Sequence, residues 1–113
     1  FFRERIHWLE MHDISRNRIV IDPGLGFGKT LAHNLLILNR AHEYNSLGCP
    51  VLIGHSRKSF IGKILGNDRI DRDIPTAIIS GLLANKNISI VRVHDVEKTH
   101  HALQISRAMT NPL

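Results

Sequence analysis

Three groups of polar residues in this sequence have side chains suited to binding a small polar ligand. The first is Asp22, which precedes Pro23 and a glycine-rich segment, 24–28. A carboxylate at such a position can accept two parallel hydrogen bonds from a planar edge with N–H and NH2 groups, as in a guanidine-like heterocycle. Alternatively, Asp22 accepts hydrogen bonds from its own loop, as an aspartate before proline often does. Asp22 alone leaves both interpretations open.

The second group follows Gly54 and consists of Ser56, Arg57, Lys58 and Ser59. Hydroxyl and cationic donors on one loop suit a carboxylate, a carbonyl oxygen or a phosphate. The same residues also fit a helix start, in which Ser56 or Ser59 is the cap and the cations are solvated. The loop therefore indicates either an anion-binding site or the beginning of a helix.

The third group contains Arg92 and His94. Arg92 lies in the β-branched run 88–93, where a charged side chain needs a partner or a ligand. His94 shares the side-chain direction of Arg92 as long as the strand continues, so the two can bind one anion together. Asp95, in turn, can cap the helix that follows. We therefore expect Arg92 to be a functional residue.

The glycine-rich segment ends in Gly28-Lys29-Thr30, which is half of the phosphate-loop pattern of nucleotide-binding proteins. The complete pattern has a glycine five positions before Gly28, and that position is Pro23. The spacing therefore argues against a P-loop NTPase. The glycines either make a tight turn or let the backbone approach a ligand, and one loop can do both.

Each polar group follows a short apolar run that is typical of a buried strand. The runs are 19–21, 50–53 and 88–93, and the segments with helical character are about 2–9, 34–44, 60–65, 73–84 and 96–109. Alternation of this kind predicts parallel βαβ units, whose ligands bind at the carboxyl ends of the strands. In the fourth helical segment Asp73 is the predicted cap. We therefore expect the three polar groups at one edge of one sheet.

The number of strands is too small for a complete α/β domain. Three strands cannot close a barrel, and an open sheet of three would leave apolar edges exposed. We therefore expect the chain to be part of a larger domain, with further sequence before Phe1.

The composition sets limits on the class of protein. The chain has 113 residues, 42% of them apolar, with a formal net charge of +5. Its basic residues are scattered among acidic ones and aromatics are few, so nucleic-acid binding is not expected. No run approaches 18 apolar residues, the charged N-terminus does not fit a signal peptide, and a single cysteine, Cys49, cannot form an internal disulfide. We expect a cytoplasmic protein without nucleic-acid or membrane partners.

Together, the three motifs resemble dihydropteroate synthase. They are Asp22-Pro23-Gly24-x-Gly26-Phe27-Gly28-Lys29, Gly54-x-Ser56-Arg57-Lys58-Ser59 and Arg92-Val93-His94-Asp95, in the order and spacing of that family's last three βα units. The resemblance spans nearly the whole chain. It implies a TIM (β/α)8 barrel, in which residues 1–113 are the C-terminal part of a single pterin-binding domain and supply about the last three βα units.

The resemblance also implies a transferase of folate biosynthesis. Such an enzyme condenses 6-hydroxymethyl-7,8-dihydropterin pyrophosphate with p-aminobenzoate to give 7,8-dihydropteroate and pyrophosphate. Pyrophosphate leaves the pterin methylene carbon in an SN1-like displacement, and the aniline nitrogen then attacks. The family uses Mg2+ and is a sulfonamide target, and we expect a homodimer. The family's magnesium-binding Asn lies outside this chain, so we assign no metal ligand.

The resemblance gives residues of all three groups specific roles. Asp22 would bind the aminopyrimidine edge of the pterin, and Lys58 its carbonyl oxygen or a ring nitrogen. Arg92 would stack on the pterin and, with His94, hold the pyrophosphate. Lys58, Arg92 and His94 are therefore the expected catalytic residues, because catalysis would depend on positioning and on stabilising the charge of the leaving group.

The p-aminobenzoate pocket is also implied by the resemblance. Ser56 would contact the carboxylate of p-aminobenzoate, and Phe27 and Lys58 would wall the pocket. The complete set of expected substrate-binding residues is Asp22, Phe27, Gly54, Ser56, Arg57, Lys58, Arg92 and His94, of which Arg57 has the least defined role. Leu25 and His55 receive no role.

Three alternatives stay open. Another pterin-binding barrel, such as a methyltetrahydrofolate methyltransferase, needs the same carboxylate but has no pyrophosphate to hold, so two cationic loops favour the synthase. A basic binding module would bind RNA with a steep salt dependence. The third alternative is a catalytically inactive fragment, because half of the implied site lies outside this chain.

Overall fold

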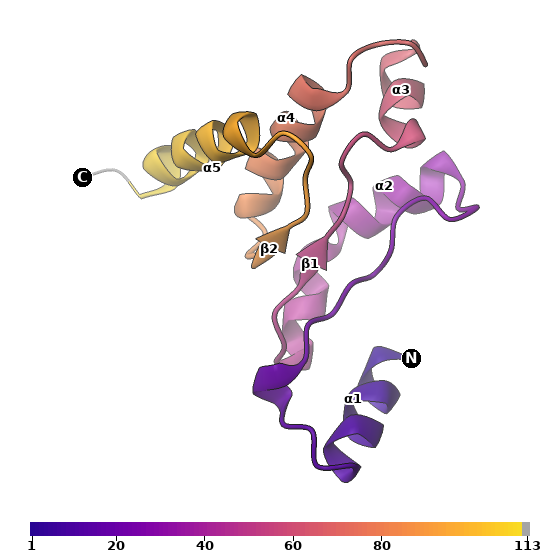
Figure 1. Ribbon diagram of the computed structural model, residues 1–113, viewed down its shortest axis with the longest axis vertical. Coiled ribbons are helices and arrows are strands. Elements are labelled where there is room, and N and C mark those ends of the chain that lie inside the picture. The colour runs from indigo at the N-terminus through magenta and orange to yellow at the C-terminus, as the bar shows by residue number, and fades with distance from the viewer. Residues whose placement is uncertain (112–113) are drawn as a thin grey trace.

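Three parallel segments form the centre of the computed structural model, which describes residues 1–111. β1 (Leu52–Ile53) pairs in parallel with β2 (Ile90–Val91), and Ile21 forms a single parallel bridge with Val51. β1 therefore lies in the middle, between the segment of Ile21 and β2 (Figure 1). The predicted parallel arrangement of the three apolar runs is confirmed.

The regular strands are shorter than the predicted runs. The run 19–21 is not a regular strand, because its only sheet pairing is the bridge at Ile21, and the other two runs keep two strand residues each. A ladder extends only where both neighbours offer partners, and Pro50, next to the bridge, has no amide to donate. Among the described residues, 19–21 and β2 are paired on one side only.

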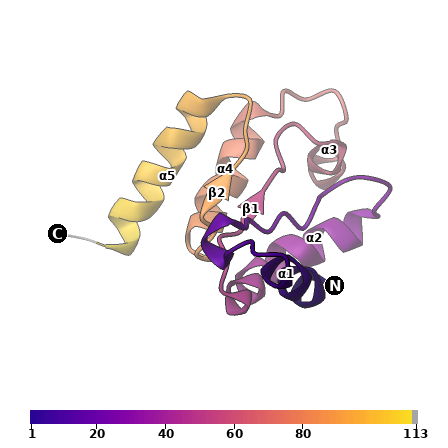
Figure 2. The same ribbon diagram turned by 60° about the horizontal axis from the view of Figure 1, so that its bottom comes forward.

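A helix follows each of these segments, and one more helix precedes the first segment. Within residues 1–111 they are α1 (Phe2–Met11), α2 (Leu31–Asn39), α3 (Ser59–Leu65), α4 (Asp73–Ala84) and α5 (Val96–Thr110), with 3-10 helices at Arg16–Arg18 and Ala41–Leu47. The helices predicted near 2–9, 60–65 and 96–109 are confirmed to within two residues. α1 lies at the opposite end of the molecule from α4 and α5 (Figures 1 and 2). No helix in this described part is long and apolar enough to cross a membrane.

α2 differs from the helix predicted at 34–44. It begins three residues earlier because the Thr30 hydroxyl accepts a hydrogen bond from the His33 amide, at 3.1 Å. It also ends earlier, at Asn39, and the chain then tightens into the second 3-10 helix. That helix ends at Gly48, whose φ of 78° places it in the left-handed region that favours glycine.

The predicted cap of α4 is wrong. Asp73 is the first residue of the helix, and the cap position belongs to Arg72, without a side-chain cap hydrogen bond. The Asp73 carboxylate instead pairs with Arg57, 16 residues earlier. The Asp73 amide donates to Asp71 Oδ1 at 2.9 Å. The Asp73 carboxylate therefore forms an ion pair with Arg57 and does not cap α4.

A helix does begin at the second polar group, because α3 starts at Ser59, but the predicted cap by Ser56 or Ser59 is wrong. Lys58 occupies the cap position of α3 and no side chain caps the helix. Ser56 is hydrogen-bonded to His94 instead. In contrast, Asp95 caps α5 as expected, because its Oδ1 accepts the Lys98 amide at 3.0 Å.

Two apolar clusters support the three segments. The larger lies between the sheet and α2, α3 and α4, and its buried members are Leu25, Leu38, Ala41, Val51, Ile53, Phe60, Ile61 and Leu83. The smaller holds α1 against the first segment through Ile6, Ile19, Ile21 and Cys49. The molecule is flat, with extents of 46 × 42 × 21 Å.

α4 and α5 pack closely on each other. A Cβ built on Gly81 would lie 3.5 Å from the carbonyl oxygen of Ala102, which is an ordinary van der Waals distance. The outer surface of the pair is apolar: Ile74, Ile78, Leu82, Ile105 and Met109 are between 58% and 78% exposed. Apolar side chains that are scattered singly over a surface are ordinary, whereas a group of them on one face is typical of an interaction site.

Candidate substrate-binding site at the carboxyl ends of the strands

The three predicted polar groups meet at one edge of the sheet. We call residues 22–30 the glycine-rich loop and residues 54–58 the serine turn. Arg92 Nη1 lies 3.5 Å from Asp22 Oδ2, which joins the loop after β2 to the glycine-rich loop. Ser56 Oγ lies 2.7 Å from His94 Nδ1, which joins the serine turn to the same segment after β2. The prediction that parallel strands bring these groups together is confirmed.

Asp22 makes both kinds of contact that its sequence position allows. Its Oδ1 accepts the Gly24 amide at 3.2 Å, so it does stabilise its own loop. Its Oδ2 faces Arg92, and the side chain is 42% exposed. The carboxylate therefore still has an open side on which a planar N–H/NH2 edge can bind.

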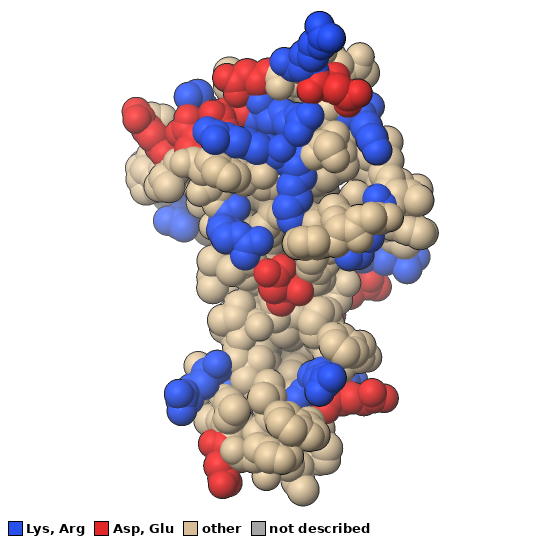
Figure 3. Space-filling view, turned by 45° about the vertical axis from the view of Figure 1, so that its right-hand side comes forward, with Lys and Arg blue, Asp and Glu red and all other residues tan. Residues whose placement is uncertain are grey.

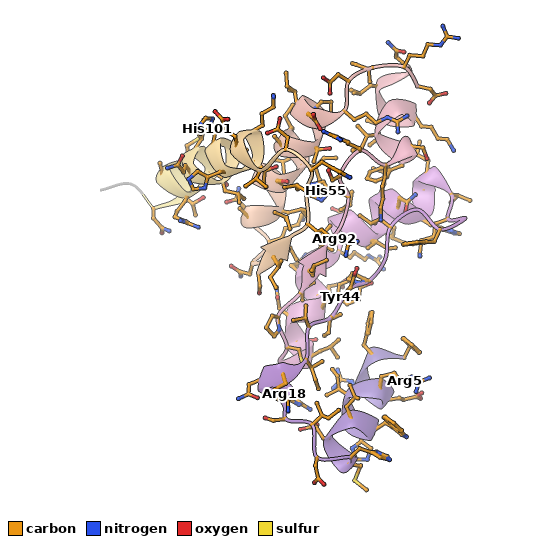
Figure 4. All side chains as sticks on the ribbon, viewed as in Figure 1. Arg5, Arg18, Tyr44, His55, Arg92 and His101 are labelled. Carbon is orange, nitrogen blue, oxygen red and sulfur yellow. The ribbon has the colours of Figure 1, made fainter. Side chains whose placement is uncertain are left out.

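Gly54 provides the space for Arg92. A Cβ built on Gly54 would lie 2.9 Å from Arg92 Cζ and closer still to Nη2. The guanidinium thus lies directly against the glycine while the Arg92 side chain remains 61% exposed. Because any larger residue at this position would displace it, Gly54 belongs to the site through its missing side chain. Figure 4 shows Arg92 near the middle of the molecule.

Lys58 crosses from the serine turn to the glycine-rich loop. Its Nζ donates to the Leu25 carbonyl at 2.8 Å and lies 4.8 Å from the centre of the Phe27 ring. Phe27 itself is 82% exposed, with a φ of 48°. Burial lowers the pKa of Lys58 and the nearby Arg92 adds to this, while Asp22 opposes it. An aromatic face and an ammonium group therefore stand side by side, open to a ligand.

Ser56 and His94 form a linked pair. The Ser56 hydroxyl accepts a hydrogen bond from the His94 amide at 3.0 Å and shares a second with His94 Nδ1. Ser56 is buried, with 8% of its surface exposed, whereas His94 is exposed. β2 ends at Val91, so strand alternation does not extend to His94. Joint anion binding by Arg92 and His94 stays a prediction.

Arg57 points to α4. Its Nε and Nη2 donate to the two carboxylate oxygens of Asp73, at 2.7 and 3.1 Å. Its carbonyl accepts Nη1 of Arg72 at 2.8 Å. The Asp73 carboxylate raises the pKa of Arg57, and Arg57 lowers the pKa of Asp73. The described contacts thus tie Arg57 to the helix, while its expected substrate contact stays a prediction.

His55, without a predicted role, is the fully buried residue of the serine turn. Its Nε2 lies 3.1 Å from the Thr76 carbonyl oxygen and 2.9 Å from Ser80 Oγ. Figure 4 shows the ring beside α4. The available signal was its place between Gly54 and Ser56, since a residue that follows a buried strand can face inward as readily as outward.

The contact that Asn34 makes with the glycine-rich loop was also not predicted from the sequence. It is 2% exposed, and its Oδ1 accepts the Gly26 amide at 2.9 Å, which ties the glycine-rich loop to α2. Its signal was a polar residue four positions before Leu38, on the buried face of an apolar helix. Leu25, likewise without a predicted role, is 1% exposed and anchors the same loop in the core.

The charge around the site favours an anionic ligand. Figure 3 shows Lys and Arg gathered over the upper half of the visible face, where acidic side chains also lie. Lys29 and Lys58 both approach the Phe27 ring, and Arg92 lowers the pKa of Lys58 by its charge. Within residues 1–111 no three His, Cys, Asp or Glu side chains lie close enough together to hold a metal ion.

Comparison with known sequences finds one matching family, and the similar proteins have names that agree with it. A family model described as pterin binding enzyme matches residues 1–94. The chain is 43% identical over 107 residues to a probable bifunctional folylpolyglutamate synthase/dihydropteroate synthase of Halobacterium salinarum, covering 93% of this chain and 13% of that protein. It is 36% identical over 111 residues to the dihydropteroate synthase of Escherichia coli K12, covering 96% of this chain and 38% of that enzyme.

Comparison with solved structures agrees. The crystal structure of Yersinia pestis dihydropteroate synthase matches with a TM-score of 0.90 and 36% identity, covering 97% of this chain and 45% of that one. A structure from Anaplasma phagocytophilum with bound 6-hydroxymethylpterin-monophosphate matches with a TM-score of 0.87 and 38% identity, covering 94% of this chain and 41% of that one. The chain therefore spans less than half the length of these relatives and structures. The resemblance predicted from the three motifs is confirmed.

Proposed function

Because the chain belongs to the pterin-binding enzyme family, we propose that it supplies part of the active site of a dihydropteroate synthase. The reaction is the condensation of 6-hydroxymethyl-7,8-dihydropterin pyrophosphate with p-aminobenzoate, which releases pyrophosphate. The observation that carries the proposal is the half-exposed Asp22 carboxylate paired with Arg92 at the strand ends, with the Lys58 ammonium nearby. A carboxylate and two cations suit a ligand with an aminopyrimidine edge at one end and a diphosphate at the other.

The pterin would lie between the glycine-rich loop and Arg92. Asp22 would accept hydrogen bonds from its N–H/NH2 edge, and Lys58 would donate to its carbonyl oxygen or a ring nitrogen. The Arg92 guanidinium, which lies against Gly54 and is well exposed, would stack on the ring and reach the pyrophosphate. Asp22 would then exchange its 3.5 Å contact with Arg92 for shorter contacts to the ligand.

The p-aminobenzoate would lie by the exposed face of Phe27 and the Lys58 ammonium, with its carboxylate at Ser56. Ser56 is already bonded to His94, so a ligand at Ser56 would also affect the residue proposed to hold the pyrophosphate. The two substrate positions are thereby linked through one hydrogen-bonded pair. Arg57 would support this pocket from the α4 side, through Asp73.

The proposed chemistry needs no covalent enzyme nucleophile. The pterin ring would stabilise the cation formed when pyrophosphate leaves, and the aniline nitrogen would attack it. Arg92, His94 and Lys58 would contribute by holding the pyrophosphate and by stabilising its developing negative charge. Mg2+ stays a prediction: the described residues offer no set of ligands for it, so no step is assigned to it.

The architecture of the whole protein is also part of the proposal. We place residues 1–113 as the C-terminal part of a (β/α)8 barrel and as about its last three βα units. The parallel order and the polar loops after each strand support this placement. The apolar outer face of α4 and α5 supports a homodimer of the whole protein, to be tested by sedimentation. A cytoplasmic location and sulfonamide binding stay predictions.

The test uses the chain and a chimera in which it replaces the matching 38% of the Escherichia coli synthase. We expect the chimera to bind the pterin pyrophosphate in calorimetric titration with Mg2+, and Asp22→Asn to weaken binding about 100-fold, as for loss of a charged acceptor. Asp13→Asn makes the same chemical change at an exposed residue outside the site and should leave affinity unchanged. Equal affinity for both variants would contradict the proposed role of Asp22.

A chimera that folds but ignores the pterin would contradict the proposed function as a whole. If the chimera does bind the pterin, titration of the chain alone separates two further outcomes. Binding by the chain shows that three loops suffice for recognition, whereas binding by the chimera only shows that the remaining part of the barrel supplies essential contacts.

A further inference from the structure

His55 is the one histidine in the described chain that is fully buried, and it lies inside the loop that carries the candidate site. Resting on the proposed function, we propose that His55 is a positioning residue. Its neutral imidazole holds the serine turn against α4 and thereby sets the places of Ser56 and Lys58. His55 touches neither proposed substrate, so its effect would be indirect.

The contacts of Nε2 define the protonation of the ring. A carbonyl oxygen only accepts hydrogen bonds, so the 3.1 Å contact to Thr76 requires a proton on Nε2. Ser80 donates its own hydroxyl to the same carbonyl at 3.0 Å and is left to accept from the imidazole, at 2.9 Å. Thr76 and Ser80, one helical turn apart on α4, thus form one hydrogen-bonded cluster with His55 of the serine turn. From these contacts we assign the Nε2–H tautomer to His55.

The other nitrogen shows why the ring stays neutral. Nδ1 is buried and has no hydrogen-bond partner in the described residues. A proton there would place a positive charge in the interior, near Lys58, without a paired anion. Burial accordingly lowers the pKa of His55, although the backbone carbonyls of Thr76 and Ile53 oppose the shift. The cluster therefore persists at neutral pH without change of charge.

The backbone of the serine turn needs an anchor of this kind. Arg57 has a φ of 58°, in the left-handed region that non-glycine residues rarely adopt. Its amide donates to Thr76 Oγ1 at 3.2 Å, and the Lys58 amide donates to the His55 carbonyl at 3.2 Å. Thr76 thus holds the turn twice, by its carbonyl through His55 and by its hydroxyl through Arg57. Without the first of these, the strained turn is free to relax.

The consequences fall on the two neighbours of this turn that face the site. Ser56 follows His55 directly and is bonded to His94 across the site. Lys58 extends from the same turn to the Leu25 carbonyl in the glycine-rich loop. A shift of the turn would therefore weaken both links, and with them the p-aminobenzoate position that the proposed function requires.

Two substitutions separate positioning from simple packing. Gln places its amide nitrogen about where the imidazole has Nε2, so His55→Gln keeps the donor to Thr76. Asn is shorter and loses that reach, so His55→Asn is the matched control with the same chemistry. In the chimera we expect His55→Asn to raise the KM for p-aminobenzoate about tenfold and His55→Gln to raise it less than about threefold. An equal effect of both substitutions would overturn the proposal.

A measurement on the chain itself does not depend on activity. Long-range proton–nitrogen NMR of the histidine-labelled chain should show His55 as the Nε2–H tautomer, still neutral where exposed histidines are protonated. The His94 resonances should move in His55→Asn and stay in place in His55→Gln. An Nδ1–H tautomer, or unmoved His94 signals in folded His55→Asn, would overturn the proposal. Should His55→Asn not fold, the tautomer and His55→Gln decide.

Different results would contradict the proposed function and the proposed role of His55. A chimera that ignores pterin pyrophosphate, or is unaffected by Asp22→Asn, contradicts the proposed function. The tautomer and the coupling of His55 to His94 are read from the chain alone and are unaffected by that result.

Discussion

The glycine-rich loop and the serine turn both reach the candidate site, but they are held in opposite ways. Two side chains tie the glycine-rich loop to α2, because Asn34 accepts the Gly26 amide and Thr30 accepts the His33 amide, and Leu25 is the apolar anchor of the loop. The serine turn is held from α4 by the His55 cluster, by Thr76 Oγ1 and by Asp73. The turn is therefore preorganised, whereas the loop can adapt around a ligand, with Phe27 as its exposed wall.

The contrast suggests a division of labour in binding. Preorganised donors lower the entropy cost of fixing a ligand, and an adaptable loop can close over it afterwards. The serine turn offers Ser56 and Lys58 and is tied to α4, while the glycine-rich loop offers Asp22 and Phe27 and is tied to α2. Substitutions at the contacts of each region test this difference separately.

The largest effect is expected for Leu25→Ala, at the apolar anchor of the glycine-rich loop. Leu25 is 1% exposed in the larger core cluster, so truncation should lower the free energy of unfolding by about 2–5 kcal/mol. Urea denaturation measures this. Phe27→Ala, at an exposed side chain of the same loop, should change stability by less than about 0.5 kcal/mol. A small loss for Leu25→Ala would mean that the loop is hardly anchored.

A medium effect is expected for Thr76→Val on the serine turn. Valine keeps the shape of threonine but removes the acceptor of the Arg57 amide, at a buried position, so the loss should be about 1–3 kcal/mol. The corresponding change for the other loop is Asn34→Leu, which removes the acceptor of the Gly26 amide. Thermal unfolding of both variants compares the two regions. A larger loss for Asn34→Leu would reverse the proposed order of rigidity.

The smallest effect is expected from the Arg57–Asp73 pair, whose arginine is half exposed. Arg57 lowers the pKa of Asp73, so the pair stabilises the fold above the ordinary pKa of aspartate. That contribution disappears as the pH falls through the lower pKa of the folded state. The stability difference between the wild type and Asp73→Asn should therefore vanish in acid and shrink in high salt. A difference that persists at low pH would exclude the ion pair as its cause.

The order of the elements and the three polar groups could be predicted because both depend on local patterns. Apolar runs, helical spacing and the parallel rule together place Asp22, Ser56 and Arg92 at one edge. The Asp95 cap is local too, three residues from its partner amide, and it was predicted correctly.

The predictions that were wrong concern contacts between residues far apart in the chain. Asp73 was predicted as a cap, yet Arg57 holds its carboxylate, and Ser56 bonds to His94, 38 residues away, instead of capping a helix. Strand lengths depend on neighbouring strands, so the run 19–21 gave a single bridge. The burial of His55 is decided by where α4 packs, and no periodicity in one segment records that.

The two open sides of the sheet have a practical consequence. Val20 and Ile90 are 48% and 41% exposed, and they lie on segments paired on one side only among the described residues. Free amides and carbonyls beside β-branched side chains are a template for edge-to-edge association. The separate 113-residue chain should therefore stay in solution best when dilute, and aggregate with rising concentration unless further strands cover those edges.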